Sequence, residues 1–240
     1  MESPPRKIER RIVAEKGFTL VELMIVVAII IILAILSLFG ASKFKSRARG
    51  ATCASNLRQI GSAILAYAVD NNGQLPPLED RTAEGDKLKG IWPRIVADGG
   101  YLSMVRNSKG ELGCGAGVWA CPDCTTVQRN FNGYGVAEGT VMKVERGSRP
   151  GINSMRLAAI SDPSRTWLVG DAAKNPNDLK TGWYAVWANP NQWKNAHSPA
   201  ARHGGKVNVC MVDGHVEAFT MPELMNKDLT LFKLRGNPAR

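Results

Sequence analysis

Cysteine and histidine are scarce in this chain, whose 240 residues contain only five cysteines and three histidines. So few cysteines exclude a disulfide-rich scaffold, and the odd number leaves at least one thiol unpaired within the chain. The sequence also lacks a Gly-x-Ser-x-Gly element, a phosphate-binding loop and a His-Glu-x-x-His pair. We therefore expect a protein that is not an enzyme and that needs no cofactor.

Long apolar runs are rare too. The mean hydropathy is −0.15, which excludes a protein with several membrane spans. Apolar residues make up 44% of the chain and charged residues 22%, so there is enough apolar surface for a buried core. The formal net charge is +10, but bases and acids are interspersed beyond residue 50. Binding to nucleic acid is therefore not expected.

The one long apolar run extends from Leu23 to Leu36, and no charge occurs between Leu23 and Ala41. Its residues are apolar all round, which argues against a soluble helix with one polar face. A helix over this charge-free stretch is about 28 Å long, close to the thickness of a bilayer core. The run is too long for a secretory signal, and bases follow it in place of a cleavage site. Because bases lie on both sides, charge alone does not fix the orientation.

A specific motif opens this run. Lys16–Leu23 reads KGFTLVEL, which puts the carboxylate of Glu22 one turn into an apolar helix. A charge there costs about 3 kcal/mol in lipid, so it needs a partner. The motif resembles the signal of type IV pilins and type II secretion pseudopilins. The resemblance is close from Lys16 to about Leu36 and looser through Pro77. It implies cleavage after Gly17 by a prepilin peptidase and N-methylation of Phe18.

The resemblance also implies a function and a location. The chain would be a structural subunit or assembly factor of a type IV pilus-like or type II secretion pseudopilus filament in bacteria. Its partners would be the prepilin peptidase, other pilin or pseudopilin subunits through the N-terminal helix, the pilus or secretion assembly platform and the membrane. The alternative is a minor tip pilin, or a membrane-anchored binding module for a surface, sugar or DNA that does not polymerise. The N-terminus would be cytoplasmic, the single span in the inner membrane, and the head periplasmic or extracellular.

We expect four regions. They are a leader at 1–17, a transmembrane helix at 18–41, an amphipathic continuation at 42–70, and a loop-rich and β-rich head at 71–240. The continuation carries an apolar stripe at helical spacing, formed by Cys53, Leu57, Ile60, Ile64 and Tyr67. Asn71-Asn72-Gly73, followed by Pro76-Pro77, should end the helix near Asp70. The predicted fold is α+β, with this long helix packed on an antiparallel sheet, as in pilins.

The clearest strands come late in the chain. They are predicted at 166–170, 183–187, 206–212 and 215–220, with a polar loop at 78–90, a short helix or strand at 154–160 and a short helix at 223–226. Asp213-Gly214 predicts a two-residue type I′ turn between the last two strands. That turn would put Val209, Met211, Val216 and Ala218 on the core face, and Cys210, His215 and Glu217 on the other. Trp183 and Trp187 share one strand face, which is a core face or a sugar- or surface-binding platform.

His203 lies nine residues before Asp213 and Gly214. This His-X9-Asp-Gly pattern resembles the C-terminal motif of a subfamily of prepilin-like proteins, which implies no activity. A strand at 206–212 would hold His203 and Asp213 about 30 Å apart at most. Asp171 is a better partner for His203 if strands 166–170 and 206–212 are antiparallel neighbours. Asp171 and His203 would then form a structural hydrogen bond or ion pair, belong to a metal or ligand site, or make no contact.

Three cysteines form a second candidate site. Cys114 precedes Cys121 and Cys124, which form a CxxC pair. Outside the cytoplasm such thiols form a structural disulfide by default. A zinc site with a histidine, or a redox site, are the alternatives. Cys53 and Cys210 fit buried apolar positions, and we interpret them as packing residues.

Overall fold

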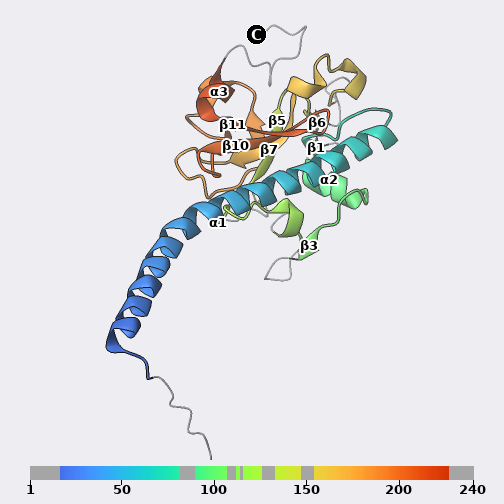
Figure 1. The fold of residues 1–240 in the computed structure, drawn as a ribbon. Coiled ribbons are helices and arrows are strands. Elements are labelled where there is room, and N and C mark those ends of the chain that lie inside the picture. Colours follow the sequence, from blue (N-terminus) through green and yellow to red (C-terminus); the bar gives the residue numbers. More distant parts are fainter. Residues whose placement is uncertain are drawn as a thin grey trace, which may run out of the picture. The chain divides into compact units, whose positions relative to one another are not determined.

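The computed structural model describes residues 17–81, 90–106, 112–113, 116–125, 133–146 and 154–226 (Figure 1). Leader residues 1–16, Cys114 and the chain beyond residue 226 lie outside these ranges, as do the side chains of residues 36–43. The chain divides into two compact units, Met1–Phe44 and Lys45–Arg240. We call the second unit the head unit.

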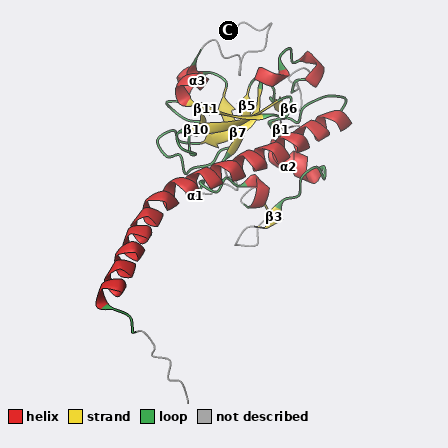
Figure 2. Ribbon diagram, in the orientation of Figure 1, coloured by secondary structure: helices red, strands yellow, loops and turns green. Residues whose placement is uncertain are grey.

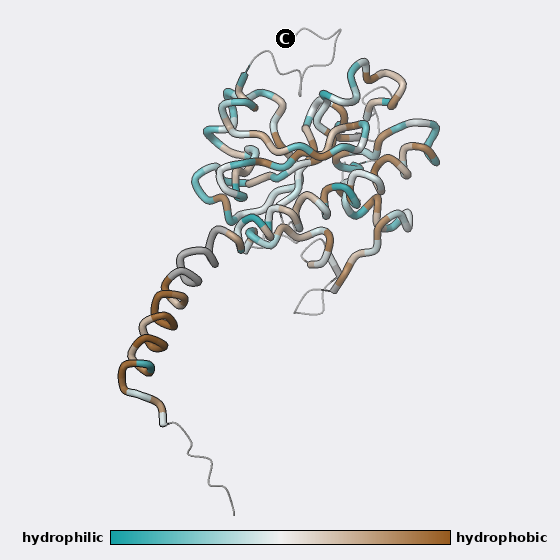
Figure 3. The backbone as a smooth tube through the Cα atoms, in the orientation of Figure 1, coloured by the Kyte–Doolittle hydropathy of each residue, from teal (hydrophilic) through white to brown (hydrophobic). Residues whose placement is uncertain are grey.

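One long helix, α1, occupies Leu20–Asp70 and confirms the predicted helix. The large apolar side chains described from Phe18 to Ile35 are exposed, with exposed fractions from 45% at Val26 to 81% at Phe18, which precedes the helix. Figure 3 shows the hydrophobic character of these first turns. Over the residues that the structure describes, no helix combines the length and the apolar character that a membrane crossing needs. The transmembrane segment at 18–41 therefore stays a prediction.

The helix ends where the sequence predicts. Asn72 and Gly73 have φ angles of 55° and 79°, in the left-handed region that Asn tolerates and Gly favours. The Gly73 N–H donates to the Ala68 carbonyl at 2.7 Å. This bond satisfies one of the carbonyls that a helix leaves unpaired at its C-terminus.

The apolar stripe of α1 packs into the hydrophobic core of the head unit. Cys53, Leu57, Ile60 and Ile64 are fully buried, as predicted. Tyr67 is only half-buried, and its ring packs edge-on against the Tyr101 ring, with 5.6 Å between the ring centroids. Within the head unit, α1 runs across one face of the main sheet (Figure 1).

The main sheet has the strand order β11-β10-β7-β5-β8, with β9 paired to β7. Figure 2 shows its strands β11, β10, β7 and β5 on one side of α1. Its strands are β5 (Tyr134–Glu138), β7 (Trp167–Ala173), β8 (Ala185–Trp187), β9 (Ser198–Pro199), β10 (Lys206–Met211) and β11 (Val216–Thr220). Four of these six strands were predicted, and β5 and β9 were not. The β7–β10 pairing is antiparallel, as expected. The β5–β8 pairing is parallel, so the sheet is mixed, and the predicted antiparallel sheet is confirmed only for the other pairs.

Smaller elements surround this sheet. A second sheet, β2-β1-β6, joins β1 (Glu79–Arg81), β2 (Gly90–Ile91) and β6 (Val144–Arg146), while β3 (Val105–Arg106) pairs with β4 (Leu112–Gly113). The helices are α2 (Trp92–Asp98) and α3 (Met221–Met225), with short 3₁₀ turns at Gly117–Trp119, Leu157–Ala159, Pro163–Arg165 and Pro190–Gln192. The predicted polar loop at 78–90 thus contains β1 and the first residue of β2. The predicted helix near 223–226 is α3, which begins two residues earlier.

The β10–β11 hairpin differs by one residue from its predicted register. Cys210 pairs with Val216 and Asn208 with Ala218. Gly214 has a φ of 91°, whereas Asp213 is absent from the positive-φ residues. The connection is therefore not type I′, and it matches the three-residue loop in which a turn is followed by one left-handed glycine. The predicted core face is confirmed for Val209 and Met211, which are buried, and it is wrong for Cys210, which is buried, and for Ala218, which is exposed.

Cys210 is buried because α1 covers β10 at a glycine. A Cβ atom added at Gly61 would lie 2.4 Å from the Cys210 Sγ atom. Replacing glycine with alanine inside a helix normally stabilises it by about 1 kcal/mol. At Gly61 the clash between the added Cβ atom and the Cys210 sulfur should outweigh this gain. We expect Gly61→Ala to lower the free energy of unfolding by about 1–3 kcal/mol, the usual cost of overpacking.

The matched control for this prediction is the double variant Gly61→Ala with Cys210→Ala, which removes the obstructing sulfur. It should recover most of the loss in a urea titration followed by circular dichroism. If Gly61→Ala alone proves stabilising, α1 does not approach β10 as closely as described.

Candidate functional site

The processing segment lies at the start of α1. Gly17, Phe18 and Thr19 precede the first helical residue, Leu20. The Thr19 N–H and hydroxyl both donate to the Glu22 Oε2 atom, at 2.9 and 2.8 Å. The Glu22 N–H donates back to the Thr19 Oγ1 atom at 3.3 Å. These reciprocal bonds form a capping box, which pairs otherwise unsatisfied N–H groups at a helix start.

The capping role of Glu22 was missed at the sequence level. Glu22 was interpreted only as a buried charge that needs a partner from another subunit. The Thr-x-x-Glu spacing of Thr19 and Glu22, just before an apolar run, is the signal that could have found it. Within one chain, the carboxylate therefore already accepts two hydrogen bonds.

A second group of functional side chains lies inside the head unit. Four potential metal-binding atoms, one from each residue, lie within 4.8 Å of one another, and all four residues have buried side chains. We call this group the Cys/His/Asp cluster; its members are Cys53, Cys121, Asp171 and His203. They come from α1, the loop after the 3₁₀ turn at 117–119, β7, and the residues before β10.

His203 lies at the centre of the contacts in this cluster. Its Nε2 atom is 3.5 Å from the Cys121 Sγ atom and 3.7 Å from the Asp171 Oδ2 atom. Its Nδ1 atom is 3.0 Å from a carboxylate oxygen of Asp123, although the two atoms are not aligned as a hydrogen bond. The other oxygen of Asp123 accepts from Arg49 of α1 at 2.7 Å. Asp123 is thus held between α1 and the imidazole ring.

The cysteines complete the cluster from the opposite side. The Cys53 Sγ atom is 2.9 Å from the Cys121 Sγ atom. This thiol contact lowers the pKa of Cys121 and raises that of Cys53.

Asp171 is an unusual residue to find in a core. It is fully buried, and burial raises the pKa of its carboxyl to about 7. The Oδ2 atom accepts from the Asn208 N–H at 2.9 Å, whereas the Oδ1 atom has no hydrogen-bond partner among the described residues. The nearby Arg202 guanidinium stabilises negative charge on both Asp171 and Cys121. A buried carboxylate with one unsatisfied oxygen is costly unless something else binds it.

The structure brings together only part of the predicted thiol site. Cys121 belongs to the cluster, but the Cys124 thiol donates to the Lys180 carbonyl at 3.1 Å. Both thiols are free, so no disulfide joins this pair, and Cys114 lies outside the described residues. Cys53 is buried in the core, as its interpretation as a packing residue requires, and its sulfur also faces Cys121.

The sequence predicts that His203 lies closer to Asp171 than to Asp213. The structure places His203 beside Asp171, while Asp213 contacts His215 with a 2.6 Å distance between carboxylate and Nδ1. The two strands that carry this geometry, β7 and β10, are adjacent. The signal that could have added Cys53 is its position on the buried face of α1, opposite these strands.

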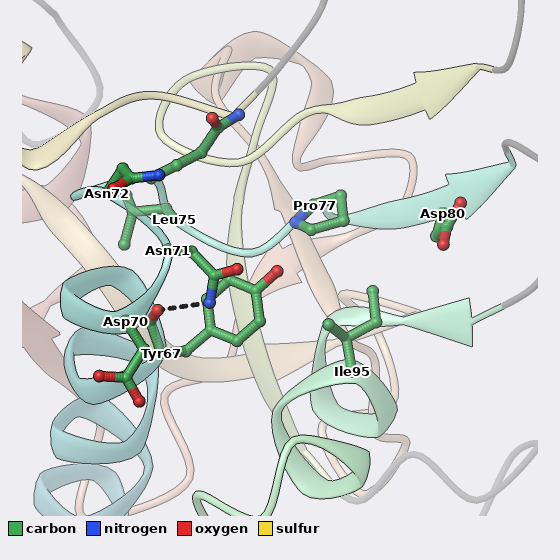
Figure 4. Close-up of a pocket in the computed structure, with 9 residues that line it drawn as sticks. Tyr67, Asp70, Asn71, Asn72, Leu75, Pro77, Asp80 and Ile95 are labelled. Carbon is green, nitrogen blue, oxygen red and sulfur yellow. Dashed lines mark hydrogen bonds between the residues drawn. The ribbon is translucent and has the colours of Figure 1, made fainter.

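A cysteine, a histidine and a carboxylate in contact are also the parts of a nucleophilic site. Here the exposed fraction is 1% at Cys121, and 4% for the His203 side chain. The pocket shown in Figure 4 lies elsewhere in the head unit, at the C-terminal end of α1, and no cluster residue lines it. Its lining includes Tyr67, Asp70 and Asn71 but no cysteine or histidine. The cluster therefore has the geometry of a closed site.

The predicted tryptophan platform is a small aromatic group around His197. The His197 ring stacks on Trp183 with 5.0 Å between ring centroids, and lies 4.7 Å from Trp187. Both tryptophans are half-buried and pack on the core. This arrangement fits the interpretation as a core face.

Comparison with known proteins bears on the N-terminal part of the chain. A family model described as the prokaryotic N-terminal methylation motif matches residues 13–38. Competence protein ComGC of Bacillus subtilis (strain 168) is 34% identical over 94 residues, which are 38% of this chain and 96% of that protein. The ComG operon protein 3 homolog of Bacillus licheniformis is 30% identical over 71 residues, 30% of this chain and 73% of that protein. No solved structure matches.

Proposed function

This chain belongs to the type IV pilin-like family, and on that premise we propose that it is a structural subunit or assembly factor of a pilus-like or secretion pseudopilus filament. A prepilin peptidase would cleave it after Gly17 and methylate Phe18. Its helix would lie in the bacterial inner membrane before assembly, with the head on the far side from the cytoplasm. Its further partners would be other pilin subunits and the assembly platform.

One observation carries this proposal. The capping box of Thr19 and Glu22 begins a helix directly after Gly17-Phe18, and the large apolar side chains described from Phe18 to Ile35 are exposed. A continuous exposed apolar surface of this kind marks a membrane or a protein contact. Lipid before assembly, and neighbouring helices after it, would both cover these side chains.

Glu22 supplies the specificity of that contact. A carboxylate in an apolar helix is expensive unless a cation lies nearby. Cleavage after Gly17 creates an amine on Phe18, and the amine of a neighbouring subunit is a suitable cation. The pairing of one subunit's amine with another's carboxylate favours a staggered stack of helices.

The size of the head favours a second candidate. The match to ComGC covers only 38% of this chain, so most of the head has no counterpart there. A minor tip subunit, or an anchored binding module that does not polymerise, would use such a head to contact a surface or a sugar. Crosslinking followed by filament isolation separates these cases, because the chain would be abundant in filaments, restricted to tips, or absent.

The charge of Glu22 can be tested apart from its capping role. Glu22→Leu removes both functions, whereas Glu22→Gln keeps a capping-box residue and removes the charge. We expect both variants to enter the membrane normally and to lower the filament-incorporated fraction at least about tenfold, since each 1.4 kcal/mol lost from a contact is a tenfold change. Quantitative immunoblots of membrane and filament fractions measure this ratio.

The control is Glu217→Gln, which makes the same charge change at an exposed position of the head unit. It should assemble like the unmodified chain. Normal incorporation of Glu22→Gln together with failure of Glu22→Leu would mean that capping, and not charge pairing, is what assembly requires.

A further inference from the structure

We propose that the Cys/His/Asp cluster is a structural zinc site. The proposal goes beyond filament assembly and does not depend on it. The cluster joins one helix, one loop, one strand and the segment that precedes β10 at a single point of the head unit. Its members are Cys53, Cys121, Asp171 and His203.

The first argument is the donor set. Thiolates are soft ligands, an imidazole is borderline and a carboxylate is hard; this mixture suits zinc and does not suit calcium or magnesium. Four protein ligands fill a tetrahedral shell and leave no position open, as in structural zinc sites. Complete burial of the four side chains agrees with a closed site.

The second argument is the spacing. Zinc bonds of about 2.0–2.3 Å require about 3.3–3.8 Å between the ligand atoms of a tetrahedron. The His203 Nε2 atom is 3.5 Å from the Cys121 sulfur and 3.7 Å from the Asp171 oxygen. The two sulfurs, at 2.9 Å, need to separate by roughly 1 Å, which a change of side-chain rotamer can supply.

The third argument is the support around these ligands. A zinc-binding histidine commonly directs its second nitrogen at a carboxylate, which fixes the ring and raises its basicity. Asp123 lies 3.0 Å from the Nδ1 atom of His203 and is itself held by Arg49. Gly50 of α1 permits this approach, because a Cβ atom there would lie 3.1 Å from the His203 Cβ atom.

The fourth argument is charge. Two thiolates, a carboxylate and Zn²⁺ sum to one negative charge, and binding releases the two thiol protons to solvent. The half-buried Arg202 lies close enough to act on both Asp171 and Cys121. Its guanidinium is fixed in place by donating to the carbonyls of Gly133, Ala172 and Thr181. With Arg202 included, the zinc-bound cluster is neutral.

A disulfide between Cys53 and Cys121 is the competing outcome. Its formation would need an oxidant and an S–S distance of about 2.05 Å. It would leave Asp171 buried without a partner for its second oxygen, and His203 without a role. The zinc site accounts for all four residues, and for this reason we favour it.

The test is the metal content of the full-length chain purified in detergent under reducing conditions. Elemental analysis should find about one zinc per chain, and substitution with cobalt should give the spectrum of a tetrahedral thiolate site. Cys53→Ser and His203→Gln should each abolish stoichiometric zinc. Asp123→Asn should fold and bind zinc about 10–100-fold more weakly, as expected for a residue that orients a ligand.

The matched controls are Cys124→Ser and Cys210→Ala, which change buried cysteines outside the cluster and should keep one zinc per chain. Three results would overturn the proposal. They are a zinc-free chain whose Cys53 and Cys121 peptides are disulfide-linked, a zinc-free chain with both thiols open to alkylation, and full zinc content in Cys53→Ser.

Discussion

Replacing Gly17 with leucine should abolish maturation, so that nearly every chain keeps its first 17 residues. The effect must arise in the peptidase, because among the residues that the structure describes an added Cβ atom at Gly17 meets nothing within 4 Å. Leucine therefore leaves the fold unchanged and obstructs only the enzyme that must grip the Gly17–Phe18 bond. Intact-mass spectrometry of the membrane fraction distinguishes the two N-termini directly.

Gly17→Ala is the control for size. Its single methyl group should be tolerated at least in part, so some chains should begin at a methylated Phe18. An unmodified chain that still begins at Met1, in a host that has the peptidase, would exclude the proposed processing. A Gly17→Leu chain that begins at Phe18 would show that cleavage does not depend on the glycine.

Trp167→Ala should lower the free energy of unfolding of the head unit more than Gly61→Ala does. Trp167 is fully buried in β7, and its indole N–H donates to the Gly135 carbonyl at 3.1 Å. Gly170 is shaped to this ring, because a Cβ atom there would lie 2.5 Å from it. Truncation of such a side chain typically costs about 3–5 kcal/mol.

Thermal or urea unfolding of the full-length chain, followed by far-ultraviolet circular dichroism, measures this loss. Trp167→Phe keeps most of the apolar volume and removes only the donor and part of the ring. It should therefore lose clearly less stability than Trp167→Ala. Equal losses in the two variants would mean that the indole hydrogen bond, and not the packing over Gly170, dominates at this position.

The parts of the fold that local chemistry determines were predictable. The end of α1 is an example, since Asn72 and Gly73 are residues that tolerate positive φ, and both have it. The late strands were found from their β-branched and aromatic residues. The register of the β10–β11 hairpin was missed because a glycine at position 214 is compatible with both a two-residue and a three-residue loop. Packing of β10 against α1 decides between them, and no local pattern reports it.

The Cys/His/Asp cluster was predictable only in pieces. Strand adjacency led to the pair of Asp171 and His203, and the CxxC spacing drew attention to Cys121. Cys53 was placed correctly on a buried stripe, but periodicity reports only that a side chain is buried. What lies opposite it depends on which loop crosses α1, and residues 78–165 gave too weak a pattern to place that loop.

The way α1 enters the head unit has a mechanical consequence. Within about one helical turn, Arg49 pairs with Asp123, Gly50 lies against His203, and Cys53 meets Cys121. A force that pulls on α1 along its axis would act on these three contacts at the same time. They would then have to break together and not one after another. Bonds that share a load in parallel yield at a higher force than bonds that break in turn. Residues 49–53 of α1 would therefore resist a pull on the helix together, as one attachment to the rest of the head unit.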